Sequence, residues 1–162
     1  VDNDKFIKGI ATTKWNNNYS NNGTPHDNFC VDTDFFLFRV AEAYLNAAEA
    51  EMHINGEGSA KAKGYIDALR NRAHAAVRPS YTLNDVLDER SRELYCEGLR
   101  RTDLIRFNQF GGTQATYKWE LKGGSTNGTT FTKAYNVYPL PSSEVRSNKN
   151  LTQIDGYNEV QN

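Results

Sequence analysis

The sequence has few of the residues that stabilise a fold covalently or bind metals. Its 162 residues include two cysteines, three histidines, four prolines and one methionine. Cys30 and Cys96 lie far apart in unrelated surroundings, which favours two buried small side chains over a disulfide. No C-x-x-C motif occurs, and His26, His53 and His74 show no ligand spacing. The sequence therefore predicts no metal site and no cofactor.

Charge and hydropathy exclude further classes of protein. Lys and Arg number 19 and Asp and Glu 20, so the net charge is -1, and both signs are interspersed along the chain. Because no basic patch is present to neutralise a phosphate backbone, we expect no nucleic-acid partner. No run of about 18 apolar residues occurs, so no membrane-spanning helix is predicted. The G-x-S-x-G, P-loop and H-E-x-x-H motifs are also missing.

What the sequence does contain is a dense charged stretch, VLDERSRELYCEGLRRTDLIRF. Five acids are mixed there with five arginines: Asp88, Glu89, Glu93, Glu97 and Asp103 with Arg90, Arg92, Arg100, Arg101 and Arg106. Thr82, with Asp85 three residues later, is typical of a capping box, and Gly98 is a typical stop. We therefore expect two helices, at about 83–97 and about 99–107.

On a helical wheel, two charges fall on the apolar face of the first of these helices. Arg90 and Glu97 lie in the middle of that face, which comprises Leu83, Val86, Leu87, Leu94 and Gly98. A buried charge without a partner costs several kcal/mol, so these charges must be paired. We expect a structural ion network made by Glu89, Arg90, Glu93, Glu97, Arg100, Asp103 and Arg106. The nearest helical neighbours give the pairs Glu89–Arg92, Arg90–Glu93 and Glu97–Arg101.

The same stretch allows a catalytic interpretation. Glu89, Glu93 and Glu97 stand four residues apart, which on a helix gives a column of carboxylates spaced by about 6 Å. Glycosidases use a pair of carboxylates about 5–10 Å apart. The balance of acids and arginines favours a structural lattice instead, because guanidinium groups do not usually saturate a catalytic acid. We therefore expect no catalytic residues.

A second pair of helices is expected upstream. Helical periodicity covers about 35–53 and about 59–74, with NGEG between the two segments and Ser59 as the N-cap of the second. The apolar faces comprise Leu37, Val40, Ala41, Tyr44, Leu45, Ala48 and Met52, and then Ala62, Ile66, Leu69 and Ala73. A short glycine-containing link predicts an antiparallel hairpin with the spacing of a tetratricopeptide-like unit. One repeat cannot bury its own face, so we expect a further partner surface.

The C-terminal third reads as mostly irregular. Alternation at Thr116–Leu121 and Thr130–Tyr135 predicts a small β-hairpin around GGSTNG. Two prolines then favour an extended segment, and Ser142 is expected to cap one short helical turn. We expect Leu151 and Tyr157 to hold the tail, which is otherwise disordered. The predicted fold class is mainly α, with a helical hairpin, a charged helix pair and long loops.

Aromatic side chains near the loops are the candidates for ligand binding. A flat ring with polar neighbours can stack on the apolar face of a sugar. The glycan-binding candidates are Trp15, Tyr19, Tyr117 and Trp119, with Tyr135 as a further one. The alternative is that Trp15 and Trp119 are half-buried residues that plug loops against the helices, and the pattern favours this alternative.

Several motifs occur together in the order found in one family. ERSRELYCEGLRRTDLIRF resembles the SusD/RagB signature, roughly E-R-x-x-E-L-x-x-E-G-x-R-x-x-D-L-x-R. The matching residues are Glu89, Arg90, Glu93, Leu94, Glu97, Gly98, Arg100, Asp103, Leu104 and Arg106. FRVAEAYLNAAEAE, LRNRA and VYPLPSSEVRSNKNLTQIDGY are similar to three further family motifs. Ile154 and Asp155 replace the usual Asn-Pro in the last of these.

The resemblance implies the C-terminal part of a larger protein. Its divisions would be an irregular lead-in at 1–34, a helical core at 35–107, and the loop, hairpin and tail at 108–162. From the residues themselves, two short strands are expected in the lead-in, one at Phe6, Ile7 and Ile10 and another at Ala11–Trp15. The family implies a non-catalytic lipoprotein on the outer surface of a Bacteroidetes-type outer membrane, anchored through an N-terminal Cys that this sequence does not include. Expected partners are an oligosaccharide, a TonB-dependent transporter of the SusC-like kind, and the N-terminal part of the same protein.

The role implied for this segment is that of a scaffold. In the family the aromatic residues that contact glycan lie mostly upstream, so the resemblance transfers no binding residue. Two other classes stay open on sequence grounds: a tetratricopeptide-like module that binds a protein segment, and a glycoside hydrolase.

Overall fold

A computed structural model describes residues 12, 14–27 and 29–157. The chain divides into two compact units, Val1–Val40 and Ala41–Asn162. The two short strands expected near the start fall mostly outside the described residues, and Thr12, Lys14 and Trp15 are not in a strand. No helix in the described part of the chain is both long and apolar enough to cross a membrane.

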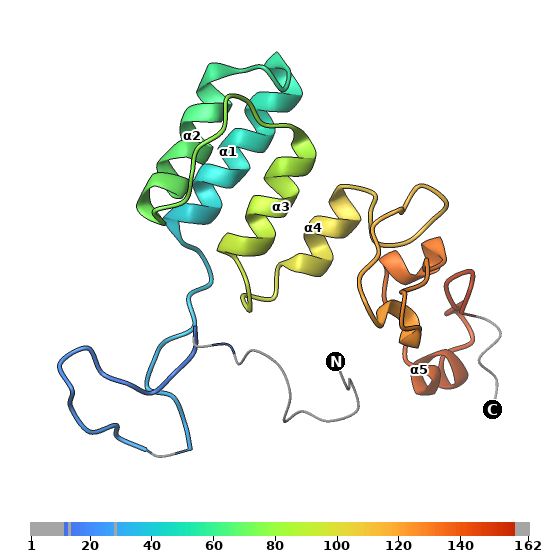
Figure 1. The fold of residues 1–162 in the computed structure, drawn as a ribbon. Helices are drawn as coiled ribbons and strands as arrows, with labels where there is room; N and C mark the ends of the chain where they lie inside the picture. The colour runs from blue at the N-terminus through green and yellow to red at the C-terminus, as the bar shows by residue number, and fades with distance from the viewer. Residues whose placement is uncertain (1–11, 13, 28, 158–162) are drawn as a thin grey trace. The chain divides into compact units, whose positions relative to one another are not determined.

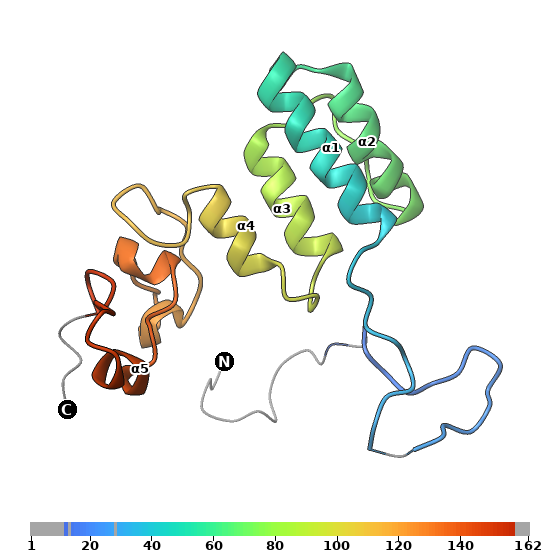
Figure 2. The same cartoon turned by 180° about the vertical axis from the view of Figure 1, so that it is seen from behind.

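Four helices make up the first part of the larger unit: α1 (Val40–Asn55), α2 (Ala60–Arg72), α3 (Leu83–Glu93) and α4 (Arg100–Arg106). The first three lie side by side, and α4 lies next to α3 (Figure 1; Figure 2 shows the same from behind). The predicted hairpin of α1 and α2 is confirmed. Gly56 turns the chain with φ +85°, a conformation that costs glycine little, and the Ser59 hydroxyl accepts a hydrogen bond from the Ala62 N–H.

Two apolar clusters bury the facing sides of these helices. One consists of Ala48, Met52, Ala62, Ile66, Tyr81 and Val86 and joins α1, α2 and α3. The other consists of Ala41, Leu45, Leu69 and Leu94. The Tyr81 hydroxyl is buried but satisfied, because it donates to Asp67 Oδ1 at 2.8 Å and accepts from the Arg78 N–H at 2.9 Å. The core is therefore small and three-helical, and the one hydroxyl within these two clusters is paired.

Two predicted helix limits differ from the structure. The first helix begins at Val40 and not near residue 35. Leu37 and Val40, which the sequence placed on the apolar face, are 78% and 71% exposed and do not join the core. The α3 helix ends at Glu93, four residues early, because Cys96 and Gly98 adopt positive φ angles of 61° and 77° that a helix cannot continue through. Leu94 stays 96% buried as the C-cap, so the apolar face persists past the helix end.

The predicted β-hairpin is wrong. Among the described residues the only β-pairing is an isolated bridge between Gly111 and Phe131. Residues 116–121 are irregular and are followed by a short 3-10 turn at Lys122–Gly124, and a second one at Lys133–Asn136 overlaps the second predicted strand. Positive φ angles at Leu121, Gly123, Gly124 and Gly128 coil the chain in place of extending it.

The C-terminal segment is held by side chains. The short helix α5 (Ser142–Ser147) begins after Pro141, which holds the N-cap position predicted for Ser142. The Gln153 amide exchanges two hydrogen bonds with the Leu140 backbone, both 2.9 Å long. The Tyr157 hydroxyl donates to the Val137 carbonyl at 2.9 Å, as its predicted anchoring role requires.

The cysteines differ from expectation in their surroundings. Cys30 and Cys96 carry exposed thiols, and neither is the buried small side chain that the sequence favoured.

Candidate functional site

The charged stretch folds back on itself so that its central ion pair is fully buried. Arg90 Nε lies 2.9 Å from Asp103 Oδ1, and both side chains are only 2% exposed. That N–H does not meet hydrogen-bond geometry, so the attraction is mainly Coulombic. Arg90 Nη1 also donates to Asn46 Oδ1 at 2.6 Å. One guanidinium thus links α3 to both α1 and α4.

A second arginine completes the inner network. Arg106 donates to both carboxylate oxygens of Glu49, at 2.7 and 2.8 Å, and to Asp103 Oδ1 at 3.1 Å. The bidentate bond to Glu49 is the main cause of the raised pKa of Arg106. Glu49 is not part of the apolar face predicted for the first helix, yet it is 92% buried because this pair covers it.

The outer carboxylates of α3 are also held by arginines. Glu89 Oε2 accepts from Arg70 at 2.7 Å and from Arg92 at 2.8 Å, and Arg72 contacts Glu93 at 2.6 Å. The expected Glu89–Arg92 ion pair is therefore present. Arg90, which was expected to pair with Glu93, forms its ion pair with Asp103. Carboxylates held in this way lack the free, desolvated member that general acid catalysis needs.

The last two arginines join the helices to the C-terminal loops. Arg100 donates to the Leu87 carbonyl at 2.8 Å, and its guanidinium carbon lies 4.9 Å from the centre of the Tyr117 ring. The ring face accounts for the buried Arg100 Nη2, which has no oxygen or nitrogen partner. Arg101 does not pair with Glu97 as expected. It donates to the Tyr135 carbonyl at 2.8 Å and lies 4.1 Å over the Tyr138 ring.

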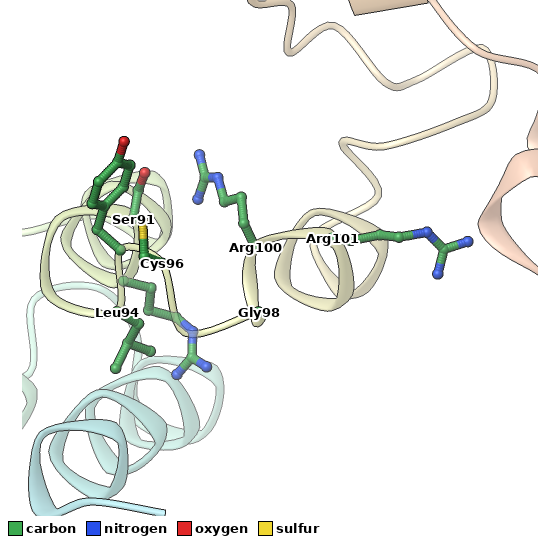
Figure 3. Close-up of a pocket in the computed structure, with 8 residues that line it drawn as sticks. Ser91, Leu94, Cys96, Gly98, Arg100 and Arg101 are labelled. Carbon is green, nitrogen blue, oxygen red and sulfur yellow. The ribbon is translucent and has the colours of Figure 1, made fainter. Parts of the chain in front are cut away.

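A cavity of about 410 Å³ opens between α3 and α4. It is lined by Arg90, Ser91, Leu94, Tyr95, Cys96, Gly98, Arg100 and Arg101. Arg100 and Arg101 point away from each other, with Arg101 reaching toward the C-terminal loops (Figure 3). All three arginines of the lining are engaged by protein groups, so the cavity offers no uncommitted cation to an anionic ligand.

The aromatic candidates are divided between the two units. Trp15 stacks on Phe35 with ring centres 5.4 Å apart. The Tyr19 hydroxyl donates to Asp32, and this bond raises the pKa of the tyrosine. Tyr117 and Trp119 lie in the larger unit, with ring centres 6.0 Å apart. The structure therefore brings Tyr117 and Trp119 together within one unit.

Tyr117 and Trp119 belong to a larger group of rings, here named the aromatic cluster. Its members are Phe110, Tyr117, Trp119, Phe131, Tyr135 and Tyr157. Phe131 is central, with ring centres at 5.3 Å from Phe110, 6.4 Å from Trp119 and 5.4 Å from Tyr135. Trp119 and Tyr135 remain 39% and 43% exposed. The cluster is thus both the core of the C-terminal loops and an exposed aromatic surface.

Sequence reasoning missed the residue at the centre of this cluster. Lys122 is 1% exposed, and its Nζ donates to the carbonyls of Phe110 at 3.0 Å and Tyr117 at 2.8 Å. Burial, with a smaller contribution from Lys118, lowers the pKa of Lys122. Strand-like alternation would place Lys122 on the solvent side with Lys118, so the pattern that predicted the hairpin also hid this lysine.

No group of three or more His, Cys, Asp or Glu side chains in the described residues could hold a metal ion. The candidate site is therefore an aromatic surface supported by cations.

Comparison with known proteins places the chain in a family. The family model described as the SusD family matches residues 1–157. The chain therefore belongs to the SusD family. Its mainly helical fold, with a tetratricopeptide-like arrangement, is the fold expected from the sequence.

Three relatives illustrate the range of similarity. The chain is 42% identical over 154 residues to the starch-binding protein SusD of Bacteroides thetaiotaomicron, covering 94% of this chain and 27% of that protein. A surface glycan-binding protein A from Bacteroides uniformis is 31% identical with TM-score 0.61, covering 74% and 27%. A SusD superfamily protein from Parabacteroides distasonis is 25% identical with TM-score 0.64, covering 78% and 28%. The chain spans about a quarter of the length of the curated relatives it matches.

Proposed function

We propose that this chain is the C-terminal part of a non-catalytic, cell-surface protein that binds oligosaccharides. Membership of the SusD family carries the proposal, because relatives in that family are named for binding starch or surface glycan and not for cleaving it. The guanidinium groups that hold Glu89 and Glu93 support a non-enzymatic role. The whole protein would be lipid-anchored on the outer surface of the outer membrane.

The exposed part of the aromatic cluster is the surface proposed to contact ligand. Trp119 and Tyr135 present partly exposed rings while their neighbours fix them from behind. Such rings lose little side-chain freedom on binding, so stacking on a sugar is not offset by much lost entropy. Trp15 and Tyr19 remain secondary candidates, since they lie in the other unit.

Affinity electrophoresis tests the binding proposal. The 162-residue chain is run in native gels with and without starch or laminarin in the matrix. We expect retardation in at least one gel, and a clear loss of retardation for Trp119→Ala. Tyr95→Ala is the matched control, because Tyr95 is 58% exposed but lies outside the aromatic cluster. Equal migration with and without each polysaccharide would argue for a protein-interaction module instead.

A separate test addresses catalysis. Reducing-sugar release from the same polysaccharides should stay at the level of a blank, and Glu93→Gln should not change it. Release that disappears in the Glu93→Gln variant would overturn the non-enzymatic role.

The proposed transporter partnership has its own test. We propose that the whole protein works with a SusC-like TonB-dependent transporter and helps to close it over captured ligand. We expect the gene for this chain to lie beside a gene for a large β-barrel transporter, and the two proteins to co-purify from detergent-solubilised membranes. Purification of the tagged protein without any such transporter would contradict the partnership.

A further inference from the structure

Lys122 is an unusual residue to find at the centre of a small aromatic core. Its ammonium nitrogen lies 4.8 Å from the centre of the Trp119 ring, 5.1 Å from that of Phe131 and 5.9 Å from that of Phe110. Within the described residues, no carboxylate oxygen lies within 4 Å of this nitrogen. Two backbone carbonyls and the faces of three rings therefore compensate the charge.

An apolar side chain of the same length would fill this space without the cost of burying a charge. Unlike apolar packing, the charge imposes a defined orientation on the groups around it. Carbonyl oxygens and ring faces attract a cation only from defined positions, so Lys122 fixes the segments of Phe110 and Tyr117 and the planes of the surrounding rings.

The backbone next to Lys122 holds Trp119 in the same way. The Lys122 N–H donates to the Trp119 carbonyl at 3.1 Å. A Cβ on Gly128 would lie 2.4 Å from that carbonyl, so the close approach requires glycine. The main chain of Trp119 is thus fixed from one side and its ring from the other.

We propose that Lys122 is a positioning residue that orients the Trp119 ring and so keeps its exposed face ready to stack on a sugar. The inference rests on the proposed glycan-binding function, and it extends that function to a residue that ligand does not touch. A neutral amine still donates to the two carbonyls but loses its attraction to the rings, so ring orientation becomes sensitive to the charge of Lys122.

The test follows Trp119 directly. A Trp15→Phe background leaves Trp119 as the only tryptophan. Emission and acrylamide quenching are measured from pH 7 to pH 11 for this chain and for versions carrying Lys122→Met, Lys122→Arg or, as the matched exposed control, Lys149→Met. Affinity for the polysaccharide that retards the wild-type chain is measured in parallel, and circular dichroism reports helix content.

We expect Lys122→Met to increase quenching of Trp119 at pH 7 and to lower glycan affinity by about threefold to thirtyfold, the range of one cation–π contact. Lys122→Arg should keep the neutral-pH emission, and Lys149→Met should match the parent. In the parent, Trp119 emission should change as Lys122 loses its proton at alkaline pH. This change should be missing in Lys122→Met and in Lys122→Arg. Lys118, Tyr117 and Tyr135 are the other ionisable groups nearby, and any change in emission that they cause would persist in those variants.

Each outcome decides one point. Unchanged Trp119 quenching in Lys122→Met, or unchanged glycan affinity despite altered quenching, overturns the positioning role. If Lys122→Met loses its helix signal, the alkaline change in Trp119 emission in the parent and its absence in Lys122→Arg decide the question. If the parent binds no polysaccharide, the proposed function fails, while the quenching result still tells whether Lys122 orients Trp119.

Discussion

Replacing Arg90 by leucine tests how far the buried ion network stabilises the fold. Arg90 and Asp103 are each 98% buried. Without Arg90, the 3.1 Å contact from Arg106 is the only salt bridge left to the Asp103 carboxylate within the described residues. Leaving one member of a buried pair without its partner costs about 3–5 kcal/mol. At about 2–4 °C per kcal/mol for a chain of this size, Tm should fall by about 6–20 °C. Differential scanning calorimetry at neutral pH measures both quantities.

Two further variants make this measurement interpretable. Arg92→Leu is the matched control, because Arg92 lies on the same helix but is 52% exposed, so its loss should cost less than about 1 kcal/mol. Replacing Arg90 and Asp103 together by leucine should cost less than the sum of the two single losses, since no charge is then stranded. A drop in Tm below about 2 °C for Arg90→Leu would refute the reasoning.

Other predictions concern local features. Thr82→Ala should cost about 1 kcal/mol in urea unfolding, because the Thr82 hydroxyl accepts the Asp85 N–H in the capping box. The hydrogen bond from the Thr82 N–H is the main cause of the lowered pKa of Asp85. The ionised carboxylate therefore stabilises the fold above its ordinary pKa of 3.8, and this stabilisation is lost as pH falls through the pKa of the folded state. Asp85→Asn should therefore destabilise at pH 7, and the loss should shrink as pH falls below 3.8 toward the folded pKa. Gly128→Ala should cost more than Gly98→Ala, because both have positive φ but only the first meets a backbone atom; equal losses would contradict this. Because burial lowers the pKa of Lys122 below 10.5, the native state releases this proton first, and stability should rise with pH between the two values in the parent but not in Lys122→Met.

The helical part could be predicted from local signals. The capping box, the Ser59 cap and the apolar spacing each act within a few residues, so the sequence shows them directly. The burial of Arg90 and Glu97 follows from their place on an apolar face. What local spacing could not provide was the partner of Arg90, because Asp103 and Asn46 approach only after the helices pack.

The C-terminal loops were not predictable in the same way. Alternating residues at 116–121 indicated strands, but the left-handed conformation of Leu121 is a non-glycine exception that no composition rule identifies. Lys122 turns inward because the cluster behind it supplies carbonyls and ring faces, and this environment exists only in the folded chain. Sequence reasoning therefore named Tyr117 and Trp119 without finding the cation that joins them.

Arg100 and Arg101 also imply an order in which the chain opens. Both side chains leave α4 and reach groups of other segments, the Leu87 carbonyl and Tyr117 ring for one and the Tyr135 carbonyl for the other. The loops can detach while the helices persist, but α4 cannot unwind without releasing the loops. Amide protons of the loops should accordingly exchange with deuterium before those of α4. A ligand that reduces opening of the loops should also slow amide exchange in α4.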